Sequence, residues 1–300
     1  MTGAVGDVWK RTGMYIAPDS SREVMSVLGS IGVFSTGQRF AWRGMSSADY
    51  DLRSSLHRRL GPKTGEGAMR GAEIKLLSDA RSWGLGIRET GHIDDLQLLT
   101  DLQHYGIPTR LIDFTNNPMT ALWFACQTPG NTAVTRSGLL LALDVAKWPS
   151  FASVGSSKGK WGSVGNPNGF TLENALKSDQ PFLVESSTPN DRLRAQEGFF
   201  AAGATPRGGS LERVRRGPFV SLDVAAAHGD PNELKKMLLD ERGRGAPGAL
   251  PYVAVLIKSS LKGKLLRYLE NTYNRRPRVL FPDYAGFKDY GSSSKRGGDL

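Results

Sequence analysis

The chain has 300 residues, 39% of them hydrophobic and 23% charged. This length suits one large domain or two small ones, and the composition is that of a globular rather than a disordered protein. No apolar run approaches the ~20 residues that a membrane helix needs, and the N-terminus lacks the apolar core of a signal peptide. The single cysteine excludes an internal disulfide and a cysteine-clustered metal site. We therefore expect a soluble, cytoplasmic protein that uses no metal.

The formal charge of +10 comes from 39 Lys and Arg against 29 Asp and Glu. Such an excess favours an anionic partner, which could be nucleic acid, a phosphate-bearing cofactor or an acidic protein. The same excess can serve solubility alone. Net charge by itself leaves both interpretations open.

Helices and short strands are both expected in the first half of the chain. Ser20–Ile31 has a helical pattern, with Ser20 or Ser21 as N-cap and an apolar face. The apolar face consists of Val24, Val27, Leu28 and Ile31. The further elements expected up to residue 127 are a strand over Gln38–Gly44, helices over Arg70–Trp83 and Ile93–Tyr105, a strand over Thr109–Phe114, and a helix capped by Asn117.

Strands are more frequent in the second half. The expected elements are strands over Gly138–Val145, Pro181–Glu185 and Gly198–Ala201, a helix over Asn232–Arg242, a strand over Pro251–Ile257 and a helix over Ser259–Asn271. The Gly- and Ser-rich stretch Ser150–Phe170 predicts a long loop that covers the site, and Ala202–Gly217 a second loop. The pattern predicts a mixed α+β protein. We expect an N-terminal helical segment (1–33), one domain (34–289) and a flexible tail (290–300).

The segment Leu102–Gln127 places many hydrogen-bonding side chains directly before a strongly apolar helix. Polar side chains lie beside a core only when they bond one another, the backbone or a ligand. The helix that begins at Asn117 offers backbone N–H groups near Thr115, which favours a phosphate site. In the preceding strand, alternation puts Arg110 on one side and Asp113 on the other. The alternative is that Asp113 and Thr115 only brace the turn and cap the helix.

Five blocks of the sequence, in order, resemble the FRG domain family. "FAWRG" (Phe40–Gly44) and "LRSSLHRR" (Leu52–Arg59) are followed by the central block "QHYGIPTRLIDFTNNPMTALWFA", which is the most specific of them. "NDRLRAQEGFF" (Asn190–Phe200) resembles the family's Arg-x-x-Ala-Gln-x-Gly-x-Phe block, and "VLFPDYAGF" (Val279–Phe287) its closing Leu-Phe-Pro-Asp motif. The resemblance covers nearly the full length of the chain.

The FRG family is similar in fold to the ADP-ribosyltransferase superfamily. The resemblance implies a split, curved β-sheet core with surrounding helices, which holds NAD in a cleft. It also implies an Arg or His on the first core strand, a Ser, Thr or Tyr after the second, and an acid or amide on a later strand. Arg43, Thr115 with Asp113, and Gln196 or Glu197 match these positions.

The catalytic residues that the resemblance implies are Arg43, Asp113, Gln196 and Glu197. Superfamily transferases carry a Glu two residues after a Gln or Glu, whereas Glu197 directly follows Gln196. The catalytic acid therefore stays open between Glu197, Asp113 and Glu185. On a strand, Gln196 and Glu197 would face opposite sides, so only one of them would line the cleft.

NAD is expected as a substrate, held by a larger set of residues. That set is Arg43, Gly44, His104, Tyr105, Thr109, Arg110, Thr115 and Asn117. His104 could equally close its helix, and Tyr105 could stack on the nicotinamide ring. Cleavage of the nicotinamide–ribose bond passes through an oxocarbenium-like state that a carboxylate stabilises, while an arginine holds the pyrophosphate.

The basic excess makes nucleic acid the favoured acceptor, with protein next. The expected docking residues are Arg207, Arg213, Arg215 and Arg216, which follow the later core strand. The resemblance implies a toxin or phage-defence effector, which would have an antitoxin or other regulatory partner and no membrane contact. Two other readings stay open: an NAD glycohydrolase, and a non-catalytic module that binds a nucleotide or nucleic acid.

Overall fold

The computed structural model describes most of the chain. The described residues are 13–34, 38–50, 52–61, 63–89, 91–128, 136–152, 181–186, 189–205, 230–239 and 252–291. They form a mixed α and β protein, as the sequence predicts. Within these residues, no helix combines the length and the apolar character needed to cross a membrane.

The strands of the described residues form one large sheet and one hairpin. The large sheet has the order β1 (Tyr15–Ile16), β10 (Tyr252–Ile257), β6 (Gly138–Asp144), β2 (Phe40–Met45), β5 (Ile112–Thr115), β9 (Gly198–Ala202), β8 (Phe182–Glu185) and β7 (Ser150–Ala152). Its two outer pairs, β1 with β10 and β7 with β8, are parallel, and the remaining pairs are antiparallel. The hairpin consists of β3 (Ile87–Arg88) and β4 (Gly91–His92).

The large sheet is nearly divided in its middle. β2 pairs with β6 along its whole length, from Phe40 to Met45, but it pairs with β5 only through Trp42 and Thr115. The proximal half-sheet (β1, β10, β6, β2) and the distal half-sheet (β5, β9, β8, β7) therefore meet at one residue pair. The site described below lies at this junction.

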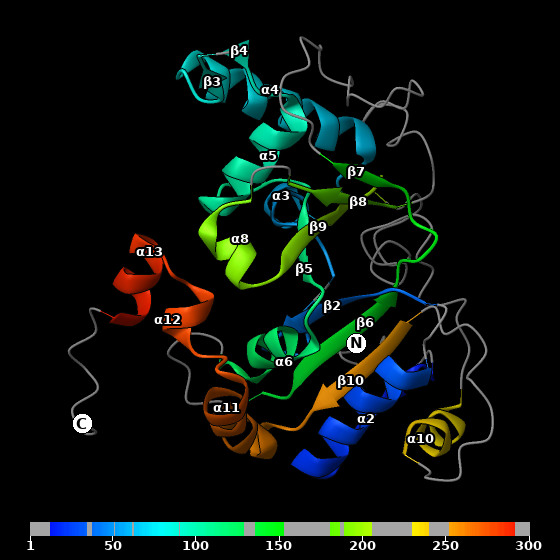
Figure 1. The fold of residues 1–300 in the computed structure, drawn as a ribbon. Coiled ribbons are helices and arrows are strands. Elements are labelled where there is room, and N and C mark those ends of the chain that lie inside the picture. Colours follow the sequence, from blue (N-terminus) through cyan, green and yellow to red (C-terminus); the bar gives the residue numbers. More distant parts are fainter. Residues whose placement is uncertain are drawn as a thin grey trace.

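Helices cover the outer faces of both half-sheets (Figure 1). The proximal half carries α2 (Ser21–Phe34), α6 (Pro118–Cys126), α10 (Pro231–Leu239) and α11 (Ser259–Tyr273), and the distal half carries α4 (Glu66–Ser82) and α5 (Asp95–His104). The shorter helices are α3 (Ser55–Leu60), α8 (Asp191–Ala195), α12 (Pro277–Leu280), α13 (Tyr284–Gly286) and the π-helical turn η1 (Phe287–Gly291).

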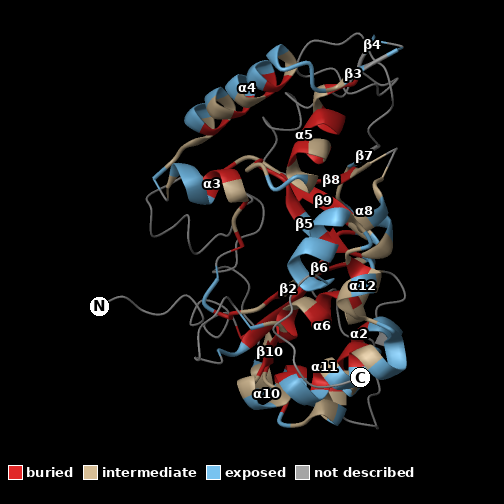
Figure 2. Cartoon of the chain, turned by 90° about the vertical axis from the view of Figure 1, so that its left-hand side faces the viewer, coloured by how far each residue is buried: buried red, intermediate tan, exposed pale blue. Residues whose placement is uncertain are grey.

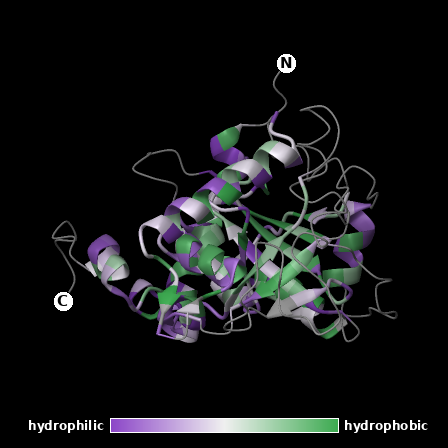
Figure 3. Ribbon diagram, turned by 90° about the horizontal axis from the view of Figure 1, so that it is seen from above, coloured by the Kyte–Doolittle hydropathy of each residue, from purple (hydrophilic) through white to green (hydrophobic). Residues whose placement is uncertain are grey.

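Three apolar clusters hold the layers together. One packs α2, α6, α10 and α11 on the proximal half, and one packs α4 and α5 on the distal half. The third, the shared core, takes residues from both halves, among them Leu141 and Ala254 of the proximal strands and Leu183 and Phe199 of the distal strands. Buried residues lie on the strands and on the sides of the helices that pack against them (Figure 2), and the strands form the hydrophobic centre of the molecule (Figure 3).

Several predicted elements are confirmed with small changes of boundary. α2 begins after Ser20, whose hydroxyl accepts from Glu23 N, and its four predicted apolar residues are buried. β6 and β10 are buried along their length, as expected for central strands. β1 and α2 pack on the same sheet as the rest of the chain. The proposed division into segment, domain and tail stays a prediction.

The strand predicted over Thr109–Phe114 is wrong at its start. β5 begins only at Ile112. The hydroxyl of Thr109 accepts a hydrogen bond from Leu111 N at 3.1 Å, which turns the chain before the strand. Thr109 and Arg110 therefore do not follow the alternation that placed them on strand faces.

Candidate active site

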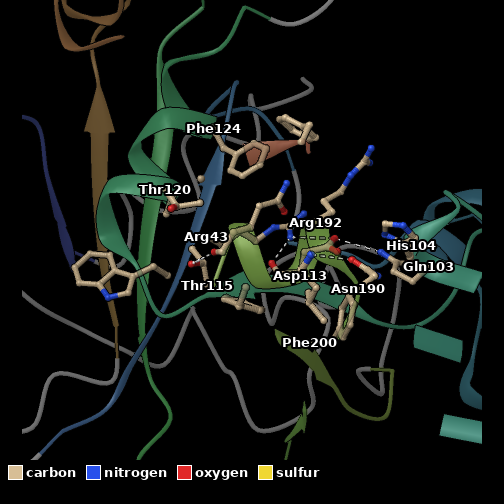
Figure 4. Close-up of a pocket in the computed structure, with 17 residues that line it drawn as sticks. Arg43, Gln103, His104, Asp113, Thr115, Thr120, Phe124, Asn190, Arg192 and Phe200 are labelled. Atoms are coloured by element: carbon tan, nitrogen blue, oxygen red, sulfur yellow. Dashed lines mark hydrogen bonds and ion pairs between the residues drawn. The ribbon is translucent and has the colours of Figure 1, made fainter. Parts of the chain in front are cut away.

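A cavity of about 340 Å³ lies where β2 and β5 separate. Its walls come from β2, β5, α5, α6, α8 and the segment after α12 (Figure 4). The polar lining residues are Arg43, Gln103, His104, Asp113, Thr115, Thr120, Asn190, Arg192 and Gln196, and the apolar ones include Trp42, Phe114, Phe124, Phe200 and Phe281. Such a mixture, with charges set among aromatic walls, is typical of small-molecule sites.

Arg43 reaches from β2 across the gap to β5. Its Nη1 donates to the backbone oxygen of Asp113 and lies 3.8 Å from the Asp113 Oδ2. Burial lowers the pKa of the Arg43 guanidinium, an effect that the Asp113 charge opposes. The guanidinium still stays protonated at neutral pH. Arg43 therefore places a fixed positive charge beside the carboxylate of Asp113.

Asp113 has a carboxylate that remains largely open to solvent. Its side chain is 59% exposed, and Gln103 Nε2 donates to its Oδ2 at 3.2 Å. The Oε1 atom of Gln103 accepts from Thr109 Oγ1 at 2.8 Å, which fixes the orientation of the amide. Asp113 is the one acidic residue among those that line the cavity.

His104 ends α5 at the edge of the cavity. Burial, followed by the nearby Arg192 charge, lowers the pKa of its imidazole, although Asp283 and Asp101 act against the shift. An imidazole with a pKa below its ordinary value of 6.5 is neutral at pH 7 and can accept a proton.

Arg192 enters the cavity from α8, the short helix that Asn190 caps. Its Nε and Nη2 donate to the two carboxylate oxygens of Asp283 at 2.8 and 2.7 Å. Its guanidinium also lies 5.0 Å from the centre of the Phe281 ring. The chain after α12 is thereby fastened to the wall of the cavity.

The turn between β5 and α6 is closed by its own side chains. Thr115 Oγ1 accepts from Asn117 N at 2.9 Å and donates to Gln196 O at 2.6 Å. Asn117 Oδ1 accepts from Met119 N and Thr120 N, as an N-cap does. The expected phosphate site at this helix end is therefore wrong, because the first N–H groups of α6 already have partners.

Gln196 and Glu197 do not lie on a strand. The expectation that they face opposite sides of a strand is therefore wrong. Gln196 ends α8, and β9 begins only at Gly198. Glu197 takes a left-handed conformation, with φ of 51°, which turns the chain between helix and strand. Gln196 lines the cavity and donates from Nε2 to Leu280 O at 3.0 Å.

Neither of the other candidate acids lines the cavity. The Oε1 atom of Glu197 accepts from Asn117 Nδ2 at 2.7 Å and from Arg275 Nη2 at 3.1 Å. Glu185, at the end of β8, pairs with Arg39 at 3.0 Å. Both carboxylates are paired with other side chains, and neither is among the residues that line the cavity.

Four residues expected to bind NAD lie outside the cavity lining. Arg110 is buried and pairs with Glu73 at 2.7 Å and with Glu66 at 3.0 Å. Its charge is therefore neutralised by two carboxylates of α4. Thr109 is buried, and Tyr105 projects into solvent beside the His104 ring. Asn117 is occupied as the cap of α6. By contrast, Arg43, Gly44, His104, Asp113, Thr115 and Gln196 are brought together.

Four polar residues of the cavity were not among the predicted site residues: Gln103, Thr120, Asn190 and Arg192. All four stand in the quoted motif blocks. Their position in blocks that resemble the FRG domain family could have identified them as candidate site residues. Nothing in the local pattern showed, however, that α8 would carry Arg192 to the same place as β2 and β5.

A second hollow, of about 670 Å³, adjoins the cavity. The two share Arg43, Gly44 and Phe124, and the second is further lined by Arg58 and Tyr50, among others. Arg43 therefore borders both spaces.

Some expectations fall on residues outside the described ranges. They are the docking arginines Arg207, Arg213, Arg215 and Arg216, nearly all of the loop Ser150–Phe170, and the tail beyond residue 291. Among the described residues, no group of three or more His, Cys, Asp or Glu side chains is arranged to hold a metal ion.

Comparison with known proteins gives one match. Residues 38–133, which include β2, β5, α6 and the whole central block, match the family model of the FRG domain. No curated protein and no solved structure matches the chain. The match supports the resemblance to the FRG domain family over the segment that supplies Arg43, Gln103, His104 and Asp113.

Proposed function

We propose that the protein binds NAD in this cavity and transfers the ADP-ribosyl group to a macromolecule, with nucleic acid as the favoured acceptor. The observation that carries the proposal is the opposition of Arg43 and Asp113 across the opening between β2 and β5. A fixed cation and a single carboxylate in an aromatic cavity suit a substrate that has a pyrophosphate and a glycosidic bond to a positively charged ring.

The arrangement of the core strands also supports the proposal. Arg43 lies on β2, Thr115 ends β5, and Gln196 directly precedes β9. This order agrees with the Arg, hydroxyl and amide positions that the resemblance implies. The near-division of the sheet between β2 and β5 agrees with the expected split core.

The two neighbouring spaces suit the two ends of a dinucleotide. The cavity volume of about 340 Å³ is at the lower end of the ~300–1,000 Å³ typical of ligand pockets, so we assign it the nicotinamide riboside half. Arg43, with Arg58 in the second hollow, binds the pyrophosphate between them. Tyr50 in that hollow offers a ring for the adenine.

In the proposed reaction, each residue acts through charge or orientation. The bond between ribose C1′ and the nicotinamide nitrogen breaks, and nicotinamide leaves with the electron pair. Asp113 stabilises the positive charge that develops on the ribose, while Gln103 holds the carboxylate in place. An acceptor oxygen or nitrogen then bonds to C1′, and neutral His104 takes the proton that it loses. Water in place of the acceptor gives NAD hydrolysis.

Labelled NAD, incubated with the protein in the presence and absence of single-stranded nucleic acid, tests the proposal. The parent protein should release nicotinamide and transfer label. Asp113→Asn should lower the rate at least ~100-fold with NAD binding retained, whereas Arg43→Ala should lose NAD binding as well.

Arg39→Ala is the matched control, because Arg39 is half exposed, pairs with Glu185 and does not line the cavity. It should behave as the parent does. Nicotinamide release without transfer would identify an NAD glycohydrolase. NAD binding without release would leave the non-catalytic binding module, and no binding at all would refute the proposal. The cytoplasmic location and the toxin or phage-defence role are parts of this proposal.

A further inference from the structure

A groove of about 800 Å³ runs along the C-terminal segment, next to the cavity. It is lined by residues of α12, α13 and η1 together with the start of α8. Its lining residues include Asp191, Arg276, Arg278, Phe281, Asp283, Tyr284, Phe287 and Tyr290. The cavity chemistry described above uses none of these aromatic side chains except Phe281.

Three aromatic rings are presented on the surface of this groove. Tyr284 is 96% exposed, Phe287 65% and Tyr290 45%. Tyr290 rests on the Phe281 ring, with 5.0 Å between the ring centres, so one ring of the group is anchored to the wall. Large aromatic side chains clustered on a surface indicate a binding face, because their exposure is unfavourable in water.

The charges of the groove favour an anion. The carboxylate of Asp283 is engaged by two nitrogen donors of Arg192 and by Gly286 N. Asp191, the other acidic residue of the lining, is outnumbered by Arg276 and Arg278. Within the described residues, Arg276 and Arg278 have no such carboxylate partner. The positive charge left in the groove therefore comes from these two arginines.

The groove and the cavity share a wall. Phe281 lines both of them, and the ion pair between Arg192 and Asp283 joins the cavity lining to the groove lining. A polymer bound along the groove would therefore lie beside the cavity, and Asp283 of the groove lining is near enough to His104 to influence its pKa.

We propose that this groove binds single-stranded nucleic acid and presents it to the cavity as the acceptor. The inference rests on the proposed function and names the surface that delivers its acceptor. Exposed rings stack on unpaired bases, and arginines beside them contact the phosphates. A duplex keeps its bases stacked on each other, so its bases cannot use the rings. Single strands are therefore favoured over duplexes, with little sequence preference.

Fluorescence anisotropy with a labelled single-stranded oligonucleotide, measured on the full chain without NAD, tests the proposal. The double variant Tyr284→Ala/Phe287→Ala should raise the dissociation constant at least ~10-fold, because each stacked base is lost. Arg278→Gln should reduce the salt slope of binding by about 0.7, the contribution of one phosphate of a single strand. These side chains are exposed, so thermal unfolding should show that the variants remain folded.

Trp83→Ala and Arg22→Gln are the matched controls, because each removes one exposed ring or one exposed charge outside the groove. Both should bind the single strand as the parent does. Equal binding by the double variant, equal loss in the controls, or a parent that binds no single strand would each overturn the proposal. Binding of a duplex as tight as that of the single strand would overturn it too, and label transfer to protein alone would point to a protein acceptor. Nicotinamide release, measured separately without nucleic acid, reports on the proposed NAD chemistry alone.

Discussion

Gly44 determines how closely α6 can approach β2 at the wall of the cavity. It lies on β2 next to Arg43, and a Cβ atom placed there would stand 1.8 Å from Ala121 O of α6. No side chain fits in that space without moving the helix backbone. Gly44, which was expected to bind NAD, therefore also has a structural role, because the absence of a side chain lets α6 approach β2 and form one wall of the cavity.

Gly44→Ala should destabilise the protein by about 3 kcal/mol or more, because the added methyl group forces β2 and α6 apart. Denaturant unfolding measures this change. Gly29→Ala is the control: no atom lies within 4 Å of a Cβ placed at that position, and in helix α2 alanine should stabilise by up to ~1 kcal/mol. A Gly44→Ala protein as stable as the parent would show that α6 can shift freely.

Some of the site residues were predictable from the sequence, whereas others that were expected to bind NAD, such as Arg110, lie outside the cavity. Arg43, Asp113, Thr115 and Gln196 do meet in one cavity. Arg110 was misjudged because strand alternation was applied to a turn that the Thr109 hydroxyl closes. Whether an arginine faces a ligand or a buried glutamate depends on packing with α4, which local pattern does not contain.

Among the elements, the ion pair between Arg192 and Asp283 joins α8 to the C-terminal segment. The hydrogen bonds from Arg192, helped by Gly286 N–H, hold the pKa of the Asp283 carboxyl below its ordinary value of 3.8, against the effect of burial. A carboxyl with a lowered folded pKa stabilises the fold fully above its unfolded pKa. That contribution is lost as the pH falls through the folded pKa.

Asp283→Asn should therefore loosen residues 281–291 at neutral pH, with a loss of about 1 kcal/mol that hydrogen exchange of this segment measures. As the pH falls below 3.8 and through the lower folded pKa, the parent should progressively lose the same contribution, so the two proteins should converge in stronger acid. Asp191→Asn is the control, because its partner Arg194 is 4.0 Å away and both side chains are exposed. A difference that persists unchanged in acid would exclude the ion pair as its cause.

Element types were more predictable than element boundaries. The apolar runs of β6 and β10 and the apolar face of α2 are local signals that any buried element carries. β5 is shorter than expected, and α4 begins before the residue predicted for it. The strand expected to carry Gln196 is a helix end instead, because Asn190 caps a short α8 that the apolar pattern does not reveal.

For the whole molecule, the two half-sheets are joined more firmly by their core than by their strands. Hydrogen bonding connects them through the pair Trp42–Thr115, yet the shared core contains side chains from both. We therefore expect one cooperative unfolding unit. Amides of Leu140 in β6 and Val184 in β8 should show free energies of opening within about 1 kcal/mol of each other.

Native-state hydrogen exchange under mild denaturant measures both amides in the same sample. Matching values support cooperative unfolding of the two half-sheets. A much lower value for Val184 would show that the distal half opens on its own, and the shared core would then be too weak to couple the halves.

The order of the strands in the sheet could not be predicted from the sequence. Composition and periodicity predicted a mixed α and β protein, which is confirmed, but not the order in which strands pair. β2 lies between β6 and β5, and β9 follows β5, so each neighbour comes from a distant part of the chain. The cavity arises from that order, since it lies where the neighbouring strands β2 and β5 separate.

The position of β10 between β1 and β6 has a consequence for synthesis on the ribosome. β10 pairs with β6 along six residues and with β1, so Tyr15 finds its partner Ala254 only when most of the chain has been made. Until then β6 has a long apolar edge without its neighbour, and pairing over such sequence distances is slow. An open apolar edge invites pairing with other chains. The unfinished protein is therefore at its most prone to aggregation just before its last strand emerges, which is when a chaperone would protect it most.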